Sequence, residues 1–157
     1  MKIFTKKISE SGTEFKGEME LETFSNNGDE LNMTKPLSFE GVLKKGNDFV
    51  EVSGKINLEY ITACHLCGTE FKRDDAIDVF EIYRREPTED EYKLTGDEIE
   101  LDEMILDNLR LNLPVRFVCK EDCKGVCTKC GKNLNFEKCE CVEERKPSPF
   151  DVLKDKM

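Results

Sequence analysis

The chain has 157 residues, of which 38% are hydrophobic and 37% charged, with ten Phe and no Trp. This length suits one domain with a small appended module, and it is sufficient for a modest hydrophobic core. No apolar run approaches the ~18–20 residues of a membrane span, and the first ten residues lack the apolar stretch of a secretory signal. We therefore expect a cytoplasmic protein rather than a membrane or exported one.

The net charge of −10 is distributed unevenly along the chain. Residues 1–100 contain 23 acidic and 13 basic side chains, whereas residues 101–157 contain 11 of each. A nucleic-acid-binding protein usually has a basic balance or at least a basic face. Any contact with a polyanion is therefore expected from residues 101–157.

Apolar and polar side chains alternate through the first half of the chain, which is the pattern of half-buried strands. The expected strands lie within 1–24 and over 37–43, 49–60 and 70–84, with a turn at 25–29. One face of the 49–60 strand carries Val50, Val52, Ile56, Leu58 and Tyr60. Gly54 falls on the same face, where a glycine indicates a bulge or a close backbone approach.

The second half of the body is less regular. The apolar side of the 70–84 strand is expected to comprise Ile77, Val79, Phe80 and Ile82. An acidic loop at 85–91 follows, and residues 99–101 suit one further strand. A helix is predicted near 102–111, with Asp102 as its cap and Pro114 beyond its end, and its apolar face is expected to pack on the sheet.

These elements predict an α+β, β-rich fold: an antiparallel sheet or small open barrel with one or two helices and a C-terminal zinc-knuckle module. We expect an acidic body at 1–113, a Cys-rich zinc-binding module at 114–141 and a tail at 142–157. The module has few large aliphatic residues, so it needs a bound metal or another crosslink to stabilise it in place of a hydrophobic core. In the tail, Ser148 and Pro149 suit the start of a short helix.

Eight cysteines are the strongest chemical signal. They are Cys64, Cys67, Cys119, Cys123, Cys127, Cys130, Cys139 and Cys141. Two of the pairs, 64–67 and 127–130, share the pattern C-x-x-C-G, in which one tight turn can direct two sulfurs at a single ion. Zinc binds four thiolates in a tetrahedron through such pairs. The even count also suits disulfides, and an iron–sulfur cluster or a redox dithiol at 64–67 are the remaining readings.

The spacing leaves the number of zinc ions and the grouping of the thiols open. The grouping that we favour joins the local set Cys127, Cys130, Cys139 and Cys141, and leaves Cys64, Cys67, Cys119 and Cys123 for a second site. The rival grouping joins the two C-x-x-C pairs, as in a zinc ribbon. A single zinc with spare cysteines is a third possibility.

Catalytic patterns are not evident in the sequence. His65 is the only histidine, and it is expected to point outward because Cys64 and Cys67 already supply ligands. A four-thiolate zinc has no open coordination position, which disfavours hydrolysis. We therefore expect no enzyme and no small-molecule substrate.

Basic side chains are interleaved with the last six cysteines. Residues 116–138 contain six basic side chains and three acidic ones. The candidate contacts to RNA or a protein partner are Arg116, Lys120, Lys124, Lys129, Lys132, Asn133, Asn135, Phe136 and, in the tail, Phe150. Phe117 is a further candidate for stacking on bases. The alternative is that the lysines only keep a metal module soluble and offset thiolate charge.

The run Cys119-Lys-Glu-Asp-Cys-Lys-Gly-Val-Cys-Thr-Lys-Cys-Gly-Lys-Asn-Leu-Asn135, followed by Cys139-Glu-Cys141, resembles the signature of the YceD family. The tail Pro149-Phe-Asp-Val-Leu153 is similar to the Pro-Phe-x-x-Leu ending of that family. The resemblance extends over roughly residues 37–153. It implies a bacterial cytoplasmic protein, not known as an enzyme, that is needed for the accumulation of large-subunit ribosomal RNA.

Three functional hypotheses follow. The first is a non-catalytic ribosome-biogenesis factor whose zinc module and tail contact precursor large-subunit (23S) ribosomal RNA or a ribosomal protein. The second is a zinc-stabilised protein–protein adaptor without RNA contact, which the acidic first hundred residues favour equally. The third is a redox protein that uses the Cys64–Cys67 pair, although no thioredoxin-like βαβ pattern surrounds it.

Overall fold

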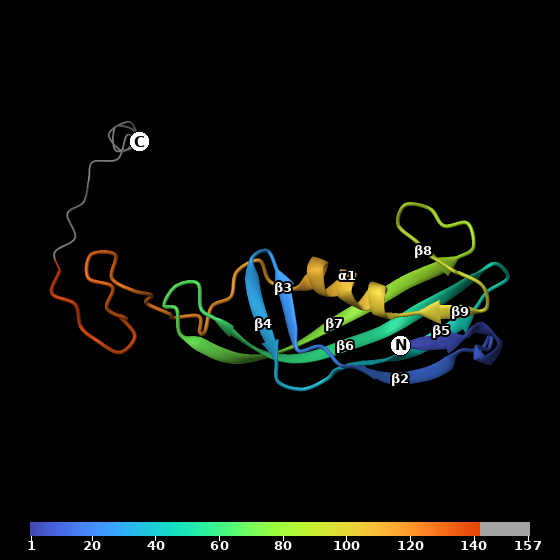
Figure 1. The fold of residues 1–157 in the computed structure, drawn as a ribbon, viewed down its shortest axis with the longest axis horizontal. Coiled ribbons are helices and arrows are strands. Elements are labelled where there is room, and N and C mark those ends of the chain that lie inside the picture. Colours follow the sequence, from blue (N-terminus) through green and yellow to red (C-terminus); the bar gives the residue numbers. More distant parts are fainter. Residues whose placement is uncertain (142–157) are drawn as a thin grey trace, which may run out of the picture.

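A computed structural model describes residues 1–141 as one long twisted sheet with a helix on one face and a cysteine-rich segment beyond one end (Figure 1). The strands of the seven-stranded sheet are β2 (Thr13–Met19), β3 (Thr23–Asn26), β4 (Asp29–Met33), β5 (Leu37–Lys45), β6 (Phe49–Ala63), β7 (Glu70–Arg84) and β8 (Tyr92–Lys93). The other elements are β1 (Lys2–Phe4), a 3-10 turn η1 (Thr5–Lys7), β9 (Glu98–Glu100) and α1 (Asp102–Asn112). The predicted β-rich fold is confirmed as an open antiparallel sheet.

Antiparallel pairing follows the order β2-β5-β6-β4-β3. Strands β5 and β4 pair with successive parts of one edge of β6, and β7 pairs along its whole other edge. The pairing of β7 with β8 is parallel. The predicted turn at 25–29 is the tip of the β3–β4 hairpin, where Asn27 and Gly28 have φ of 53° and 94°. An Asn-Gly pair accepts these positive angles readily, which favours a two-residue hairpin turn.

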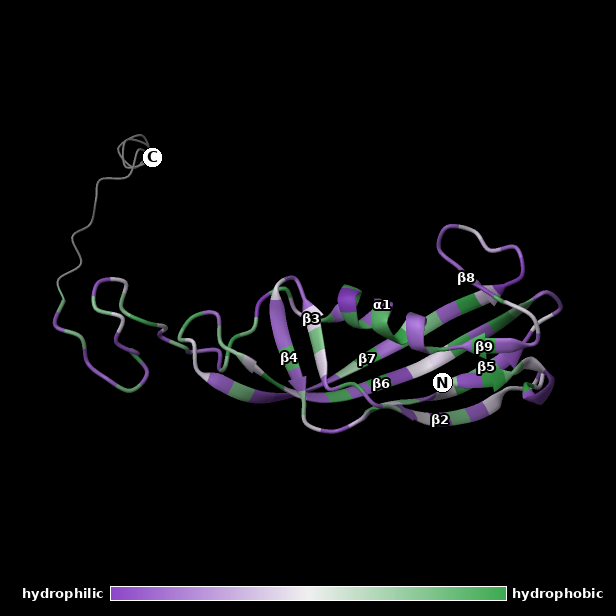
Figure 2. Ribbon diagram, in the orientation of Figure 1, coloured by the Kyte–Doolittle hydropathy of each residue, from purple (hydrophilic) through white to green (hydrophobic). Residues whose placement is uncertain are grey.

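The core combines the inner faces of β5, β6 and β7 with buried side chains of α1, the β3–β4 hairpin and the small β1–β9 ribbon. The predicted inward face of β6 is confirmed, because Val50, Val52, Ile56, Leu58 and Tyr60 are all buried. Figure 2 shows hydrophobic and hydrophilic bands alternating along β6 and β7. The opposite face is mostly polar and carries ion pairs between neighbouring strands, such as Lys55 with Asp78.

Gly54 lies opposite Gly41 where β5 and β6 pair. A Cβ atom at Gly54 would lie 2.4 Å from the carbonyl oxygen of Glu40 and 2.7 Å from the Cα of Gly41. A Cβ at Gly41 would lie 2.3 Å from the carbonyl oxygen of Ser53. The expected close backbone approach at Gly54 is therefore confirmed, and both positions require glycine.

The apolar set expected for β7 is wrong at two residues, Phe80 and Ile82, which lie on the outer face. Ile77 and Val79 are buried, but Phe80 is 63% exposed on the outer face. Side chains alternate along a strand, so Phe80 cannot share a face with its neighbour Val79. The inward side chain at that end of β7 is Tyr83, which is buried and donates a hydrogen bond from its hydroxyl to the carbonyl oxygen of Glu100.

Helix α1 lies along the inner face of the sheet and contacts β7, as the prediction of a sheet-packed helix requires (Figure 1). Its buried side chains are Met104, Ile105, Asn108 and Leu109. Asp102 does not cap it: Leu101 is the N-cap, and Asp102 is the first helical residue, where it pairs with the N-terminal ammonium group. That ion pair fixes the start of the chain beside the helix.

Among residues 1–141, no helix is long and apolar enough to cross a membrane. The described part contains one α-helix. The second helix that we expected at Ser148 and Pro149 lies outside the described residues, as does the candidate contact residue Phe150.

Candidate metal centres

The eight cysteines lie outside the helices and strands, where they come together in two groups of four. The first cysteine group consists of Cys64, Cys67, Cys119 and Cys123, and the second of Cys127, Cys130, Cys139 and Cys141. Within each group all four Sγ atoms lie within 4.8 Å of one another. The structure thus brings the eight thiols together in the grouping that the local spacing favours, and not in the ribbon-like grouping of the two C-x-x-C pairs.

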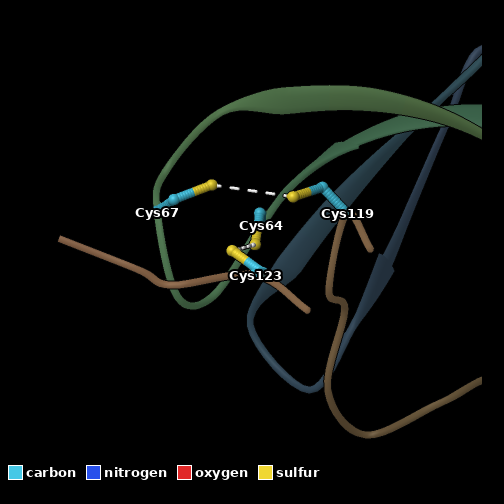
Figure 3. A group of neighbouring side chains, drawn as sticks. All are labelled: Cys64, Cys67, Cys119 and Cys123. Carbon is cyan, nitrogen blue, oxygen red and sulfur yellow. Dashed lines mark hydrogen bonds between the residues drawn. The ribbon is translucent and has the colours of Figure 1, made fainter. Parts of the chain in front are cut away.

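The first group joins two distant parts of the chain. Cys64 and Cys67 lie in the turn between β6 and β7, and Cys119 and Cys123 come from the segment after α1 (Figure 3). The turn is tight because the N–H of Gly68, at φ 69°, donates to the carbonyl oxygen of Cys64 over 2.8 Å. The longest antiparallel pair of the sheet therefore ends in two sulfurs that face the C-terminal segment.

The second group is local and more exposed. Cys127 and Cys130 lie in a similar turn, in which the N–H of Gly131 donates to the carbonyl oxygen of Cys127 over 2.8 Å. Cys139 and Cys141 return to this turn from the end of the described chain. Cys130 and Cys141 are exposed, whereas Cys64 and Cys67 of the first group are buried.

The sulfur spacing fits a tetrahedral metal ion. Zinc at ~2.3 Å from four sulfurs separates them by about 3.8 Å. In the first group Cys64 lies 3.8 Å from Cys123 and Cys67 lies 3.7 Å from Cys119. In the second group Cys139 lies 3.5 Å from Cys130 and 3.3 Å from Cys127. These Sγ–Sγ distances are longer than the ~2.05 Å of a disulfide bond, and all eight thiols are free. The structure therefore does not support the disulfide reading.

Cys64 in the first group and Cys127 in the second have a pKa below the usual value of a thiol. Burial favours the neutral form of Cys64, but backbone N–H groups at Cys119, Cys67 and Leu66 outweigh it and lower the pKa of Cys64 to about 6. Backbone N–H groups at Cys130 and Lys129 lower the pKa of Cys127 to about 6.

The pKa values of Cys119 and Cys141 shift in the opposite direction. Burial, together with hydrogen bonds to the neighbouring thiols, raises the pKa of Cys119 to about 12. Hydrogen bonds to Cys139 and Cys130 raise the pKa of Cys141 to about 12. Adjacent sulfurs thus resist joint ionisation, and a bound dication reverses this preference.

His65 is not a member of either group. Its Nε2 lies 2.8 Å from Oδ1 of Asp29, and its ring packs edge-on to Phe117 at 5.9 Å. The histidine thus points away from the sulfurs, and its contact with Asp29 links the β6–β7 turn to the β3–β4 hairpin.

Phe117 is not available for stacking on bases, because it is completely buried and packs edge-on to Tyr60. It follows Pro114, so the segment after α1 is anchored in the core before it reaches Cys119. The hydrophobic pattern at a single aromatic residue in a cysteine-rich run could not distinguish an anchor from an exposed platform.

The basic candidates have different surroundings. Lys120 pairs with Asp122 at 3.6 Å and Lys132 pairs with Glu137 at 3.4 Å. Within residues 1–141, Arg116, Lys124 and Lys138 form no ion pair. The last two help to line an open groove of about 930 Å³ beside the second group. Its lining also includes Val126, Thr128, Lys129, Leu134 and Glu137, together with Cys127, Cys139 and Cys141 of the second group.

The aromatic and amide candidates also differ. Phe136 is 78% exposed and close in sequence to the groove. Asn133 and Asn135 use their side-chain amides internally. Asn135 donates to the Sγ of Cys123 over 3.4 Å, and Asn133 donates to the hydroxyl of Thr69 over 3.2 Å. Sequence reasoning treated both as contact residues and missed their contacts to the first group.

Comparison with known proteins identifies similar sequences. The family model described as "Large ribosomal RNA subunit accumulation protein YceD" matches residues 52–155. The chloroplastic "Large ribosomal RNA subunit accumulation protein YCED homolog 1" of Arabidopsis thaliana is 39% identical over 56 residues. These residues are 36% of this chain and 17% of that protein, so the chain spans about a sixth of this relative's length. No solved structure matches.

Proposed function

This chain belongs to the YceD family, whose name refers to accumulation of the large ribosomal RNA subunit, and from this premise we propose that it is a non-catalytic ribosome-biogenesis factor of the cytoplasm. The observation that carries the proposal is the family match over residues 52–155, which includes both cysteine groups. In this role the protein binds a component of the assembling large subunit and performs no reaction on it.

Structural zinc is the metal that best suits both cysteine groups. Within the described residues each group offers four sulfurs with near-tetrahedral spacing and no other candidate ligand, which agrees with zinc and leaves no position for a reacting water. The first group replaces a core at the end of the sheet, and the second replaces a core in the segment after Cys123. Removal of the metal is therefore expected to release this segment from the body.

The surface proposed to contact RNA is the groove beside the second group, with its lysines and exposed Phe136 near it. Lys124, Lys129 and Lys138 can approach phosphates, and an exposed aromatic ring can stack on an unpaired base. Contact through Asn133 or Asn135 is not part of this proposal, because both amides are occupied within the protein.

The test is charge reversal in the groove. A variant with Lys124→Glu, Lys129→Glu and Lys138→Glu should lower the affinity for a large-subunit ribosomal RNA transcript and reduce the slope of log affinity against log salt by about 3. A matched variant with Lys7→Glu, Lys45→Glu and Lys93→Glu changes the net charge equally at exposed positions of the body. Equal losses in both variants would mean that the groove has no special role.

A second candidate function is an adaptor that binds a basic ribosomal protein. Two zinc ions with eight thiolates add about −4 to a chain that already carries −10. An open groove of about 530 Å³ between β7 and α1 is lined by Glu81, Glu89, Asp90, Glu91, Tyr92, Asp107, Arg110 and Leu111. Charge complementarity with a basic protein favours rapid encounter at such a surface.

Crosslinking in growing cells separates the two candidates. Crosslinks from residues 115–141 to large-subunit precursor RNA support direct RNA contact. A co-purified basic protein crosslinked near Glu89 and Asp107, with no RNA crosslinks, supports the adaptor.

A further inference from the structure

A small hairpin connects the two cysteine groups. The N–H of Cys127 donates to the carbonyl oxygen of Lys132 over 2.8 Å, and the N–H of Leu134 donates to the carbonyl oxygen of Gly125 over 2.9 Å. Val126 and Asn133 form an isolated antiparallel bridge between them. The tip of this hairpin is the Cys127–Cys130 turn, so the turn that belongs to the second group also sets the positions of residues 132–135.

The same hairpin lies against the turn of the first group. The N–H of Val126 donates to the carbonyl oxygen of Leu66 over 3.1 Å, between the ligand candidates Cys64 and Cys67. Gly125 has a φ of 70°, and a Cβ atom there would lie 3.0 Å from that same oxygen. The glycine therefore allows both the backbone turn and the close approach of the two segments.

Two amide side chains extend from the hairpin to the first group. Asn135 Nδ2 donates to the Sγ of Cys123 over 3.4 Å, while its Oδ1 accepts the backbone N–H of Lys124 over 3.0 Å. Asn133 Oδ1 accepts from Asn135 Nδ2 over 2.9 Å, which orients the amide of Asn135. Asn133 also donates to Thr69, the second residue after Cys67.

We infer that the two cysteine groups form one cooperative metal-binding unit, with Asn135 as the positioning residue that couples them. The inference rests on the proposed metal binding. When the second group is closed around a divalent cation, the Cys127–Cys130 turn and the hairpin are ordered. The ordered hairpin presents the side-chain amide N–H of Asn135 to the Cys123 sulfur, and such donors stabilise a ligating thiolate. The coupling is reciprocal, as binding linkage requires.

The test measures zinc occupancy of each group separately in the full chain. Zinc protects ligating thiols from alkylation, so peptide mapping at buffered free zinc gives one midpoint for Cys64 and another for Cys130. A variant with Cys127→Ser and Cys139→Ser disables the second group. It should raise the free-zinc midpoint of the first group about tenfold, the loss typical of a missing outer partner.

Asn135→Asp is the matched probe of the coupling. Aspartate keeps an oxygen for the N–H of Lys124 but removes the donor to Cys123. Alone it should also raise the midpoint at Cys64 about tenfold, and in the variant without the second group it should add little further. When Co²⁺ replaces zinc as the probe, the sulfur-to-metal absorption band of the Asn135→Asp variant should shift relative to that of the native chain. Asn112→Asp makes the same change at the end of α1, where the amide donates to Asn108, and should alter neither midpoint.

The outcomes separate the inference from the proposed function. No zinc protection in the native chain would contradict the metal role itself. Normal protection with a first-group midpoint that is unaffected by either change would overturn the coupling and leave the metal role intact. Two losses that multiply in the combined variant would show that Asn135 does not transmit the effect of the second group.

Discussion

Single residues decide where the backbone can come close. Gly54 and Gly41 face each other with less space between the strands than two Cβ atoms need. We expect Gly54→Ala to lower the free energy of unfolding by about 1–3 kcal/mol, because the added methyl group must push β5 away from β6. Urea unfolding followed by circular dichroism measures the change.

Lys55→Ala is the control for that measurement, since Lys55 is the next residue of the same strand and lies on the solvent face. Its loss removes one exposed ion pair with Asp78 and should change the free energy of unfolding by less than about 0.5 kcal/mol. Equal effects of the two substitutions would contradict the steric argument at Gly54.

At the scale of elements, the sheet and the cysteine-rich segment are stabilised by different means. β6 and β7 bury apolar side chains along 15 paired residues each, whereas the segment after Phe117 buries almost none and depends on its sulfurs. We predict that Cys127→Ser lowers the hydrogen-exchange protection of amides in 124–137 by more than about tenfold. Amides of β5 to β7 should keep their protection.

Cys64→Ser is the complementary variant. It opens the first group, which joins the end of the β6–β7 pair to residues 119–123, so protection should also fall at that end of the sheet. If Cys127→Ser unfolds the whole sheet, the division of the molecule into a packed body and a metal-stapled segment is wrong.

At the scale of the whole molecule, metal binding links stability to pH. Cys64 and Cys127 have a pKa of about 6, so each is a thiolate near neutral pH and gains a proton as the pH falls through 6. A protonated thiol does not bind zinc, and stability that depends on the metal is therefore present at neutral pH and lost in acid. A colorimetric zinc chelator should detect about two zinc ions per chain, released between pH 7 and 5.

Buffer at pH 8 with the same chelator is the control, and most of the zinc should remain bound there over the same time. Release that is independent of pH would contradict the assignment of thiolates as the ligands.

Much of the fold could be predicted from local pattern. The period-two alternation identified β5, β6 and β7, and for β7 the predicted and observed ends agree, at residues 70 and 84. Helical spacing and a following proline identified α1. The failures were at single side chains: Phe80 and Ile82 lie on the outer face of β7, and Phe117 is buried. Strict alternation along the strand is enough to place Phe80 and Ile82 on the outer face, whereas the burial of Phe117 depends on what its segment packs against and cannot be read locally.

The sequence alone determined the chemistry of this protein: eight thiols in C-x-x-C pairs, an acidic body, alternating strands and the family signature. The tertiary structure decided which sulfurs meet. Cys64 and Cys67 join thiols more than 50 residues away because the long β6–β7 pair carries its turn to the segment that Phe117 anchors. Spacing along a chain limits which atoms can share an ion, but only packing of distant segments brings them within reach of one another.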